Sequence, residues 1–256
     1  MKHIDRQILQ IALPSIVSNI TVPLLGLIDV AIVGHLGSPA YIGAIAVGGM
    51  LFNIIYWIFG FLRMGTSGMT SQAYGKRDLP EIVRLLMRSV GIGLAVALCL
   101  ILLQVPIRQT AFLIIHPTAE VREMATLYFH ICIWGTPAML GLYGLSGWFI
   151  GMQNSRIPMY IAITQNIVNI IASLSFVCFF KMKVEGVAFG TLIAQYAGFI
   201  MGLVLWMSRY GKLKKYILWK GVLQKEAMMR FFQVNRDIFL RTLCLVTVTL
   251  FFTSAG

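Results

Sequence analysis

The sequence predicts an all-α, polytopic membrane protein. Of its 256 residues, 58% are hydrophobic and only 12% are charged, and the mean hydropathy is +0.82. A typical soluble domain carries about twice that share of charge. Here the charges stand between apolar blocks that reach the roughly 20 residues a helix needs to cross a bilayer core. Spanning strands are disfavoured because the apolar character is continuous rather than alternating.

The apolar blocks define six complete spans and part of a seventh. The six cover residues 8–33, 42–69, 85–105, 124–150, 158–180 and 187–208. The last block, 238–256, is 19 residues long and has no polar tail after it. We therefore expect a six-helix transmembrane lobe at 1–208, a cytoplasmic basic linker at 209–237 and the truncated start of a seventh transmembrane helix at 238–256.

The distribution of basic residues predicts the orientation of the chain. With the amino terminus in the cytoplasm, 15 of the 21 basic residues fall in interior segments: Lys2, Arg6, Lys76, Arg77, Arg84, Arg88, Arg156, Arg209, Lys212, Lys214, Lys215, Lys220, Lys225, Arg230 and Arg236. This is the positive-inside pattern of a multi-pass protein, which we expect in the plasma (cell inner) membrane. The net charge of +12 therefore reads as a topology signal and not as a nucleic-acid-binding surface.

The linker at 209–237 alternates basic residues with aromatic and aliphatic ones. That pattern is typical of an amphipathic helix lying on an anionic lipid surface. The alternative is a target helix for a calmodulin-type partner. Within the spans, small residues four apart predict close helix packing in lipid: Gly147 with Gly151, Gly186 with Gly190, and Gly198 with Gly202.

Asp29 is the candidate functional residue of the first span. It is the only acidic residue between Asp5 and Asp78, and it lies inside a long apolar run. A charged side chain at membrane depth costs about 2.5–3.5 kcal/mol on insertion scales, so it usually faces a cavity or a partner. Low-polarity surroundings disfavour the charged carboxylate, which makes Asp29 a natural proton carrier. The alternatives are a helix cap or a pair with Arg63.

Polar residues of the fifth and sixth spans lie at a depth similar to that of Asp29. In the fifth span they recur at i, i+3 and i+7, and in the sixth at i and i+4, so each set shares one helical face. These residues are Asn166, Asn169 and Ser173, followed by Thr191 and Gln195. Each could serve interhelical hydrogen bonding alone. Their common depth instead predicts one pocket in the outer half of the bilayer.

Enzyme and metal chemistry find no support in the sequence. The four cysteines are far apart and lie in spans, the four histidines are scattered, and no phosphate-binding GxxxxGK[ST] loop is present. We therefore expect no catalytic residues, no metal site and no cofactor other than a coupling ion. Pro14 and Pro23 favour a kink in the first span.

Several motifs, in order along the whole chain, resemble the multidrug and toxic compound extrusion (MATE) transporters, especially the DinF-like branch. They are IDVAIVGHLG at 28–37, FLRMGTSGMTSQAYGKRD at 61–78, GMQNSRIPM at 151–159, NIVNIIASLSF and VEGVAFGTLIAQY within 166–196, and DIFLRTL at 237–243. The resemblance implies two six-helix lobes that exchange protons or sodium for organic, often cationic, compounds. This chain would supply the amino lobe and the start of helix seven, with the carboxy-terminal lobe missing.

The resemblance also implies roles for single residues. Asp29 matches the first-helix acid that takes the coupling cation, and Asn169 and Thr191 match polar residues of the same pocket. Pro14 matches the proline at which the first helix bends in some members. Ser173 stands where many relatives have a second acid, which leaves one carboxylate and favours proton over sodium coupling.

Two other readings compete with the antiporter. One is a lipid-linked precursor flippase of the same superfamily, which should carry more cationic residues in its cavity. The other is a non-functional structural fragment, because the chain stops inside the seventh helix of a twelve-helix family. A lone lobe would expose the face meant for its partner.

Overall fold

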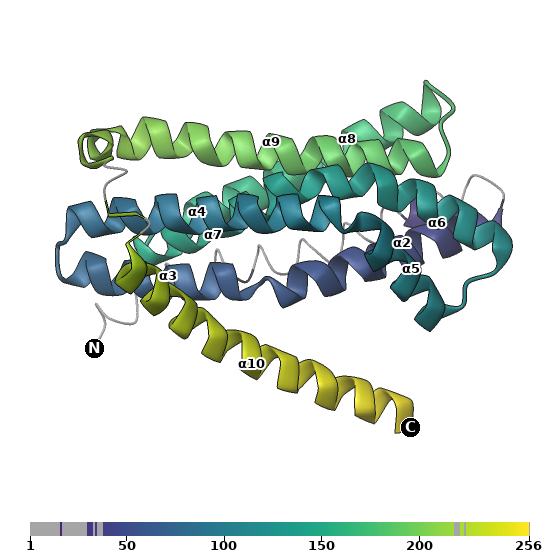
Figure 1. Cartoon of the computed structure of the whole chain (residues 1–256). Helices are drawn as coiled ribbons and strands as arrows, with labels where there is room; N and C mark the ends of the chain where they lie inside the picture. The colour runs from purple at the N-terminus through teal and green to yellow at the C-terminus, as the bar shows by residue number, and fades with distance from the viewer. Residues whose placement is uncertain are drawn as a thin grey trace.

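The computed structural model describes residues 16, 30–32, 34, 38–217, 221–222 and 224–255; for residue 242 and residues 245–255 it describes the backbone alone. Asp29 and Pro14 lie outside these residues, so the expectations for both remain predictions. The described part of the chain contains helices and no strand (Figure 1). The all-α class predicted from the sequence is therefore confirmed.

The helices follow one another with short connections. The first half contains α2 (Pro39–Ile58), α3 (Phe61–Gly75), α4 (Leu79–Leu102), α5 (Gln104–Ile115) and α6 (Ala119–Cys132). A 3-10 turn, η1 (Ile133–Gly135), leads into α7 (Thr136–Gly151), which is followed by α8 (Arg156–Cys178), α9 (Val184–Tyr210), a second 3-10 turn η2 (Gly211–Tyr216) and α10 (Lys225–Ala255).

Five helical stretches of the described chain are long and apolar enough to cross a membrane. They are Pro39–Gly75, Leu79–Leu102, Ala119–Gly151, Arg156–Cys178 and Val184–Tyr216. These stretches correspond to the second to sixth predicted spans. The protein is thus a multi-pass membrane protein, as predicted. The first predicted span, 8–33, falls almost wholly outside the described residues.

Helix α4 begins earlier than the hydropathy of the sequence suggested, and its first turn explains why. Asp78 precedes the helix, and its side chain accepts a hydrogen bond of 3.1 Å from the backbone N–H of Glu81. Pro80 occupies the first turn, where its missing N–H costs nothing. Charged residues such as Glu81 and Arg84 lower the local hydropathy, but they are compatible with a helix that is capped at Asp78.

The same distinction applies to α10. Its bounds, Lys225–Ala255, include residues 225–237, which the charge pattern of the sequence placed in the linker. Lys, Arg, Glu and Met are good helix formers, so the helix continues through the basic segment into the apolar one. Figure 1 shows α10 beside the amino-terminal part of the lobe, diverging from it toward the carboxyl end.

Glycines let α7 sit in the middle of the lobe against α3 and α4. A Cβ atom on Gly147 would overlap the Arg63 carbonyl of α3, and one on Gly151 would lie 2.8 Å from the Ser67 carbonyl. On α4, a Cβ atom on Gly93 would lie 2.7 Å from the Leu140 carbonyl of α7. The backbones approach this closely because the side chains are absent, as the small-residue spacing predicted for the first pair.

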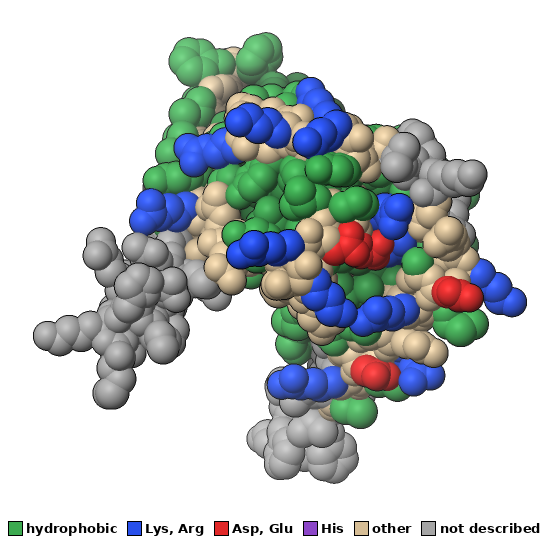
Figure 2. Space-filling model, turned by 90° about the vertical axis from the view of Figure 1, so that its left-hand side faces the viewer, with side chains coloured by type: hydrophobic (Ala, Val, Ile, Leu, Met, Phe, Trp, Pro, Cys, Tyr) green, Lys and Arg blue, Asp and Glu red, His purple; other side chains and the backbone are tan. Residues whose placement is uncertain are grey.

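Lys and Arg side chains gather at one end of the molecule. Figure 2 shows this end, with Lys and Arg side chains around an apolar centre. The α3–α4 turn and η2 contribute Lys76, Arg77, Lys212, Lys214 and Lys215. These basic residues all belong to the segments that the positive-inside pattern predicts to be cytoplasmic, and the structure brings them to one face.

Candidate functional site

The predicted polar face of the fifth span lies inside the helix bundle. Asn169 and Ser173 are fully buried, and Asn166 is 9% exposed. All three belong to α8, at the i, i+3 and i+7 positions that place side chains on one face of a helix. That face packs against α9, so the polar groups lie between two membrane-length helices rather than toward lipid.

Hydrogen bonds join three of the predicted site residues. The Asn169 amide nitrogen donates to the Thr191 hydroxyl oxygen over 3.1 Å, from α8 to α9. The Ser173 hydroxyl donates to the Asn169 amide oxygen over a long 3.5 Å. Asn169 therefore stands at the centre of the set, donating with one end of its amide and accepting with the other.

A glycine sets the distance between α8 and α9 at the level of Ser173. A Cβ atom on Gly190 would overlap the Ser173 hydroxyl and would lie 2.8 Å from the backbone nitrogen of Ser173. The two backbones can meet here because one residue has no side chain and the other has a small one. The close approach of Gly190 leaves room for the small Ser173 side chain between the two helices.

Gln195, the fifth predicted site residue of these two spans, points elsewhere. Its amide nitrogen donates to the Tyr56 hydroxyl over 3.4 Å, which links α9 to α2. Its amide oxygen is buried and has no hydrogen-bond partner within the described residues. That oxygen packs on Gly135 of η1, where a Cβ atom would overlap it. The structure brings Asn169, Ser173 and Thr191 together, whereas Gln195 forms a neighbouring contact. That these residues line one polar pocket remains a prediction.

The break in the fourth span is a feature that sequence reasoning missed. The turn η1 interrupts Ala119–Gly151, and the Thr136 hydroxyl donates to the Ile133 carbonyl over 2.7 Å. Pro137 stands in the first turn of the following helix. The Tyr196 hydroxyl of α9 donates to the Trp134 carbonyl over 2.9 Å. The Gly-Thr-Pro sequence at 135–137 could have predicted this break, because Gly and Pro commonly interrupt helices.

Within the described residues, Arg63 has no ion-pair partner, and no cluster of metal-binding side chains is found. Arg63 is half-buried on α3, and no described carboxylate lies within ion-pair distance of it. Its pairing with Asp29 falls outside the described residues. No group of three or more His, Cys, Asp or Glu side chains gathers within the part of the chain that the structure places.

The described helices thus form a membrane bundle with hydrogen-bonded polar groups buried between α8 and α9. The MatE family model matches residues 14–175, and the chain therefore belongs to the MatE (MATE) family of membrane transporters.

Curated relatives agree with this assignment. The chain is 37% identical over 245 residues to the DNA damage-inducible protein F of Escherichia coli K12, covering 94% of this chain and 52% of that protein. It is 26% identical to the chloroplastic Protein DETOXIFICATION 44 of Arabidopsis thaliana, covering 79% of this chain and 41% of that protein. A probable multidrug resistance protein NorM of Synechococcus is 22% identical, over 84% of this chain and 47% of that protein. The chain spans about half the length of the relatives it matches.

Solved structures share the fold. A MATE crystal structure in the bent conformation superposes with a TM-score of 0.87 at 19% identity, covering 98% of this chain and 56% of that one. An outward-facing multidrug resistance MATE transporter of the MOP superfamily gives a TM-score of 0.83 at 19% identity, over 97% and 55% of the two chains. The chain has the fold predicted from its sequence, a MATE-type amino lobe with the start of the next helix.

Proposed function

We propose that this chain is the amino-terminal half of a secondary active transporter that exchanges a coupling cation for small organic compounds. The observation that carries the proposal is the hydrogen-bonded set of Asn169, Ser173 and Thr191, buried between two membrane-spanning helices of a MATE-family chain. Polar groups buried inside a membrane bundle either join helices by hydrogen bonds or line a substrate or ion pathway, and we propose the second role for this set.

The names of the relatives support an export substrate of organic character. Relatives of this chain are called multidrug resistance and detoxification proteins. We propose small organic and often cationic compounds as the substrates of this chain, the class that its resemblance to the family implies. The flippase reading is less favoured, because no basic side chain takes part in the hydrogen bonds of the Asn169 set.

Asp29 is the proposed coupling residue, with a proton as the coupling ion. One carboxylate suits one proton, whereas a sodium ion prefers several oxygen ligands including carboxylates. Ser173, beside Gly190, contributes a hydroxyl where a second acid would add charge. Asn169 and Thr191 would then provide neutral hydrogen-bonding groups that tolerate both forms of the acid.

The proposed mechanism links protonation to the shape of the first helix. Protonation of Asp29 removes its charge, and the helix bends near Pro14. The bend reduces the pocket of the amino lobe and expels the bound compound. A proton can shift this equilibrium only if the two shapes differ in their affinity for it, so Asp29 must lie in different surroundings in each.

We propose the following location and orientation for the chain. The amino terminus lies in the cytoplasm, the protein resides in the plasma membrane, and a second lobe completes the substrate pathway. Membrane lipid contacts the outer face and the basic segment before α10.

The experiment that tests the proposal compares Asp29→Asn with the unaltered protein in vesicles under an imposed pH gradient. The protein is expressed together with its second lobe, and the flux of a fluorescent organic cation is measured. Loss of gradient-driven flux in Asp29→Asn is expected, while Glu123→Gln, which changes an exposed acid on α6, leaves flux intact. Unchanged flux in Asp29→Asn would remove Asp29 from coupling.

A further inference from the structure

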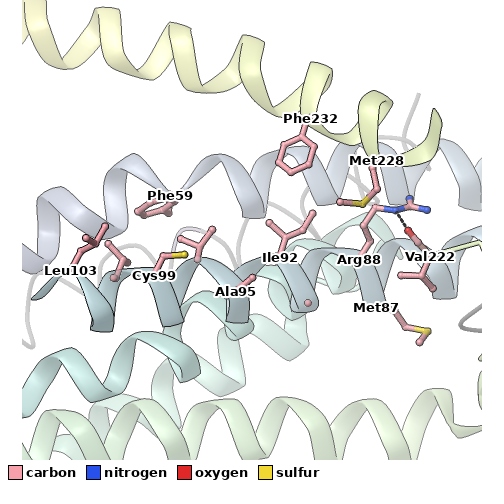
Figure 3. A pocket seen from close by; sticks show the side chains of 13 residues that line it. Phe59, Met87, Arg88, Ile92, Ala95, Cys99, Leu103, Val222, Met228 and Phe232 are labelled. Carbon is pink, nitrogen blue, oxygen red and sulfur yellow. Dashed lines mark hydrogen bonds between the residues drawn. The ribbon is translucent and has the colours of Figure 1, made fainter. Parts of the chain in front are cut away.

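A long apolar groove lies along α4 on the side that faces α10 (Figure 3). Helix α10 packs against α3 and α2, and a space of about 660 Å³ remains between α10 and α4. Met228 and Phe232 of α10 cover one side, and Phe59 lies near one end. The floor is formed by α4 and includes Gly91, Ile92, Ala95, Val96, Cys99 and Leu103.

The other end of the groove is bordered by Arg88, whose guanidinium is held by backbone carbonyls. The Arg88 side chain is 1% exposed. Its Nε donates to the Val222 carbonyl over 2.9 Å and its Nη2 to the Gly221 carbonyl over 3.3 Å. The guanidinium of Arg88 therefore fixes the turn before α10 against α4, at the point where the groove begins.

A second arginine leaves net positive charge at this end. Arg84 lies one helical turn before Arg88, and both guanidinium groups reach the same Glu81 carboxylate, over 3.6 Å and 3.3 Å. Two positive charges thus share one negative charge. The Nε of Arg84 is buried and has no hydrogen-bond partner in the described chain, and it lies beside Gly221.

We propose that the groove binds one acyl chain of an anionic phospholipid, whose phosphate lies just outside the groove, at the 30% exposed side chain of Arg84, one helical turn before the lining residue Arg88. The floor of the groove runs from Met87 to Leu103, about 24 Å along the helix at 1.5 Å per residue. Half of a bilayer core is about 15 Å thick, so the groove can hold a chain through one leaflet. The basic end of the molecule, seen in Figure 2, is the end at which the head group would lie.

The charge, rather than the apolar lining, decides which lipid binds. Burial in an apolar groove gains little over the bilayer interior, which is equally apolar, so every lipid chain fits about equally well. An arginine near the membrane surface favours an anionic head group by about 1 kcal/mol, which corresponds to about 5-fold in affinity. Met87, Met228 and Cys99 give the groove walls flexible or small side chains that adapt to a chain of variable shape.

Gly91 provides a variant that fills the groove without disturbing the lobe. A Cβ atom at Gly91 meets no atom within 4 Å, and the residue lies on the floor of the groove. Gly91→Leu therefore occupies the space of the chain. Gly68→Leu is the matched control, because a Cβ atom there also meets nothing within 4 Å and Gly68 does not line the groove. The full chain is purified and incubated with phosphatidylglycerol and phosphatidylcholine of identical acyl chains, and bound lipid is counted by native mass spectrometry.

We expect the unaltered protein and Gly68→Leu to retain one phosphatidylglycerol in preference to phosphatidylcholine. Gly91→Leu should lower retention of both lipids about 10-fold or more. Arg84→Gln, which leaves the Arg88 contacts in place, should reduce the preference for phosphatidylglycerol about 5-fold and keep the chain site. Equal retention in Gly91→Leu and Gly68→Leu would overturn the proposal, as would equal retention of the two lipids by the unaltered protein. A change in oligomeric state in Gly91→Leu with unchanged lipid retention would assign the groove to a protein contact instead.

Discussion

The Asn169 side chain on α8 and the Thr191 side chain on α9 are joined by a hydrogen bond of 3.1 Å within the helix bundle. The contact links two separate membrane-length helices, and it favours one rotation of α8 relative to α9. It also leaves the Asn169 amide oxygen turned toward Ser173.

The first prediction concerns the strength of this contact. In a double-mutant cycle of Asn169→Ala and Thr191→Val, we expect a coupling energy of about 0.6 kcal/mol, the average for interhelical hydrogen bonds in membranes. Thermal unfolding of the four proteins in detergent measures it. Strict additivity of the two single changes would show that the contact contributes nothing to stability.

The second prediction concerns Gly190. A methyl group there must move α9 away from the Ser173 backbone, so Gly190→Ala should lower the free energy of unfolding by about 1–3 kcal/mol. At Gly49, where a Cβ atom meets nothing within 4 Å, the same change should be neutral or stabilising by up to about 1 kcal/mol, because Ala favours helix. A Gly190→Ala protein as stable as Gly49→Ala would contradict the close approach.

The third prediction concerns the seat of α10 on α3. A Cβ atom on Gly65 would overlap the amide oxygen of Asn235, which is 2% exposed. Gly65→Ala should therefore separate the two helices, and Asn235→Ala should restore their contact in the double variant. Spin labels on α3 and α10 report the distance by pulsed electron resonance. A distance that is unchanged in Gly65→Ala, or not restored in the double variant, counts against this packing.

The fourth prediction separates binding from stability at Gln195. Its amide oxygen has no partner in the described chain and its amide nitrogen makes one long bond, so Gln195→Leu should change the free energy of unfolding by less than about 1 kcal/mol. If the buried amide contacts substrate, the apparent affinity for the transported compound should fall while the protein stays folded. Unaltered transport with unaltered stability would remove Gln195 from the site.

Much of the fold could be predicted because hydropathy reports what lipid requires. The five long helical stretches lie where apolar runs predicted them, and the shared face of Asn169 and Ser173 follows from helical periodicity alone. The helix bounds at Leu79 and Lys225 could not be predicted in this way. Hydropathy marks the ends of the apolar segment, whereas the helical backbone continues into the polar residues beside it.

The candidate site was predictable in part for the same reason. Depth and helical face brought Asn169, Ser173 and Thr191 together, since both follow from position along a helix. The direction of Gln195 depends on Tyr56 and on the turn at Gly135, which come from other spans. Contacts of that kind depend on how helices pack, and a single span carries no information about its neighbours.

In the proposed mechanism, Asp29 gains and loses a proton as the transporter works. Infrared difference spectroscopy of the protein in lipid, with Asp29→Asn as the blank, detects the protonated carboxyl group directly as pH is varied. We expect this group to titrate within the physiological range and its titration to shift when a transported compound is added. A carboxylate that remains ionised across that range, with and without the compound, would contradict this mechanism.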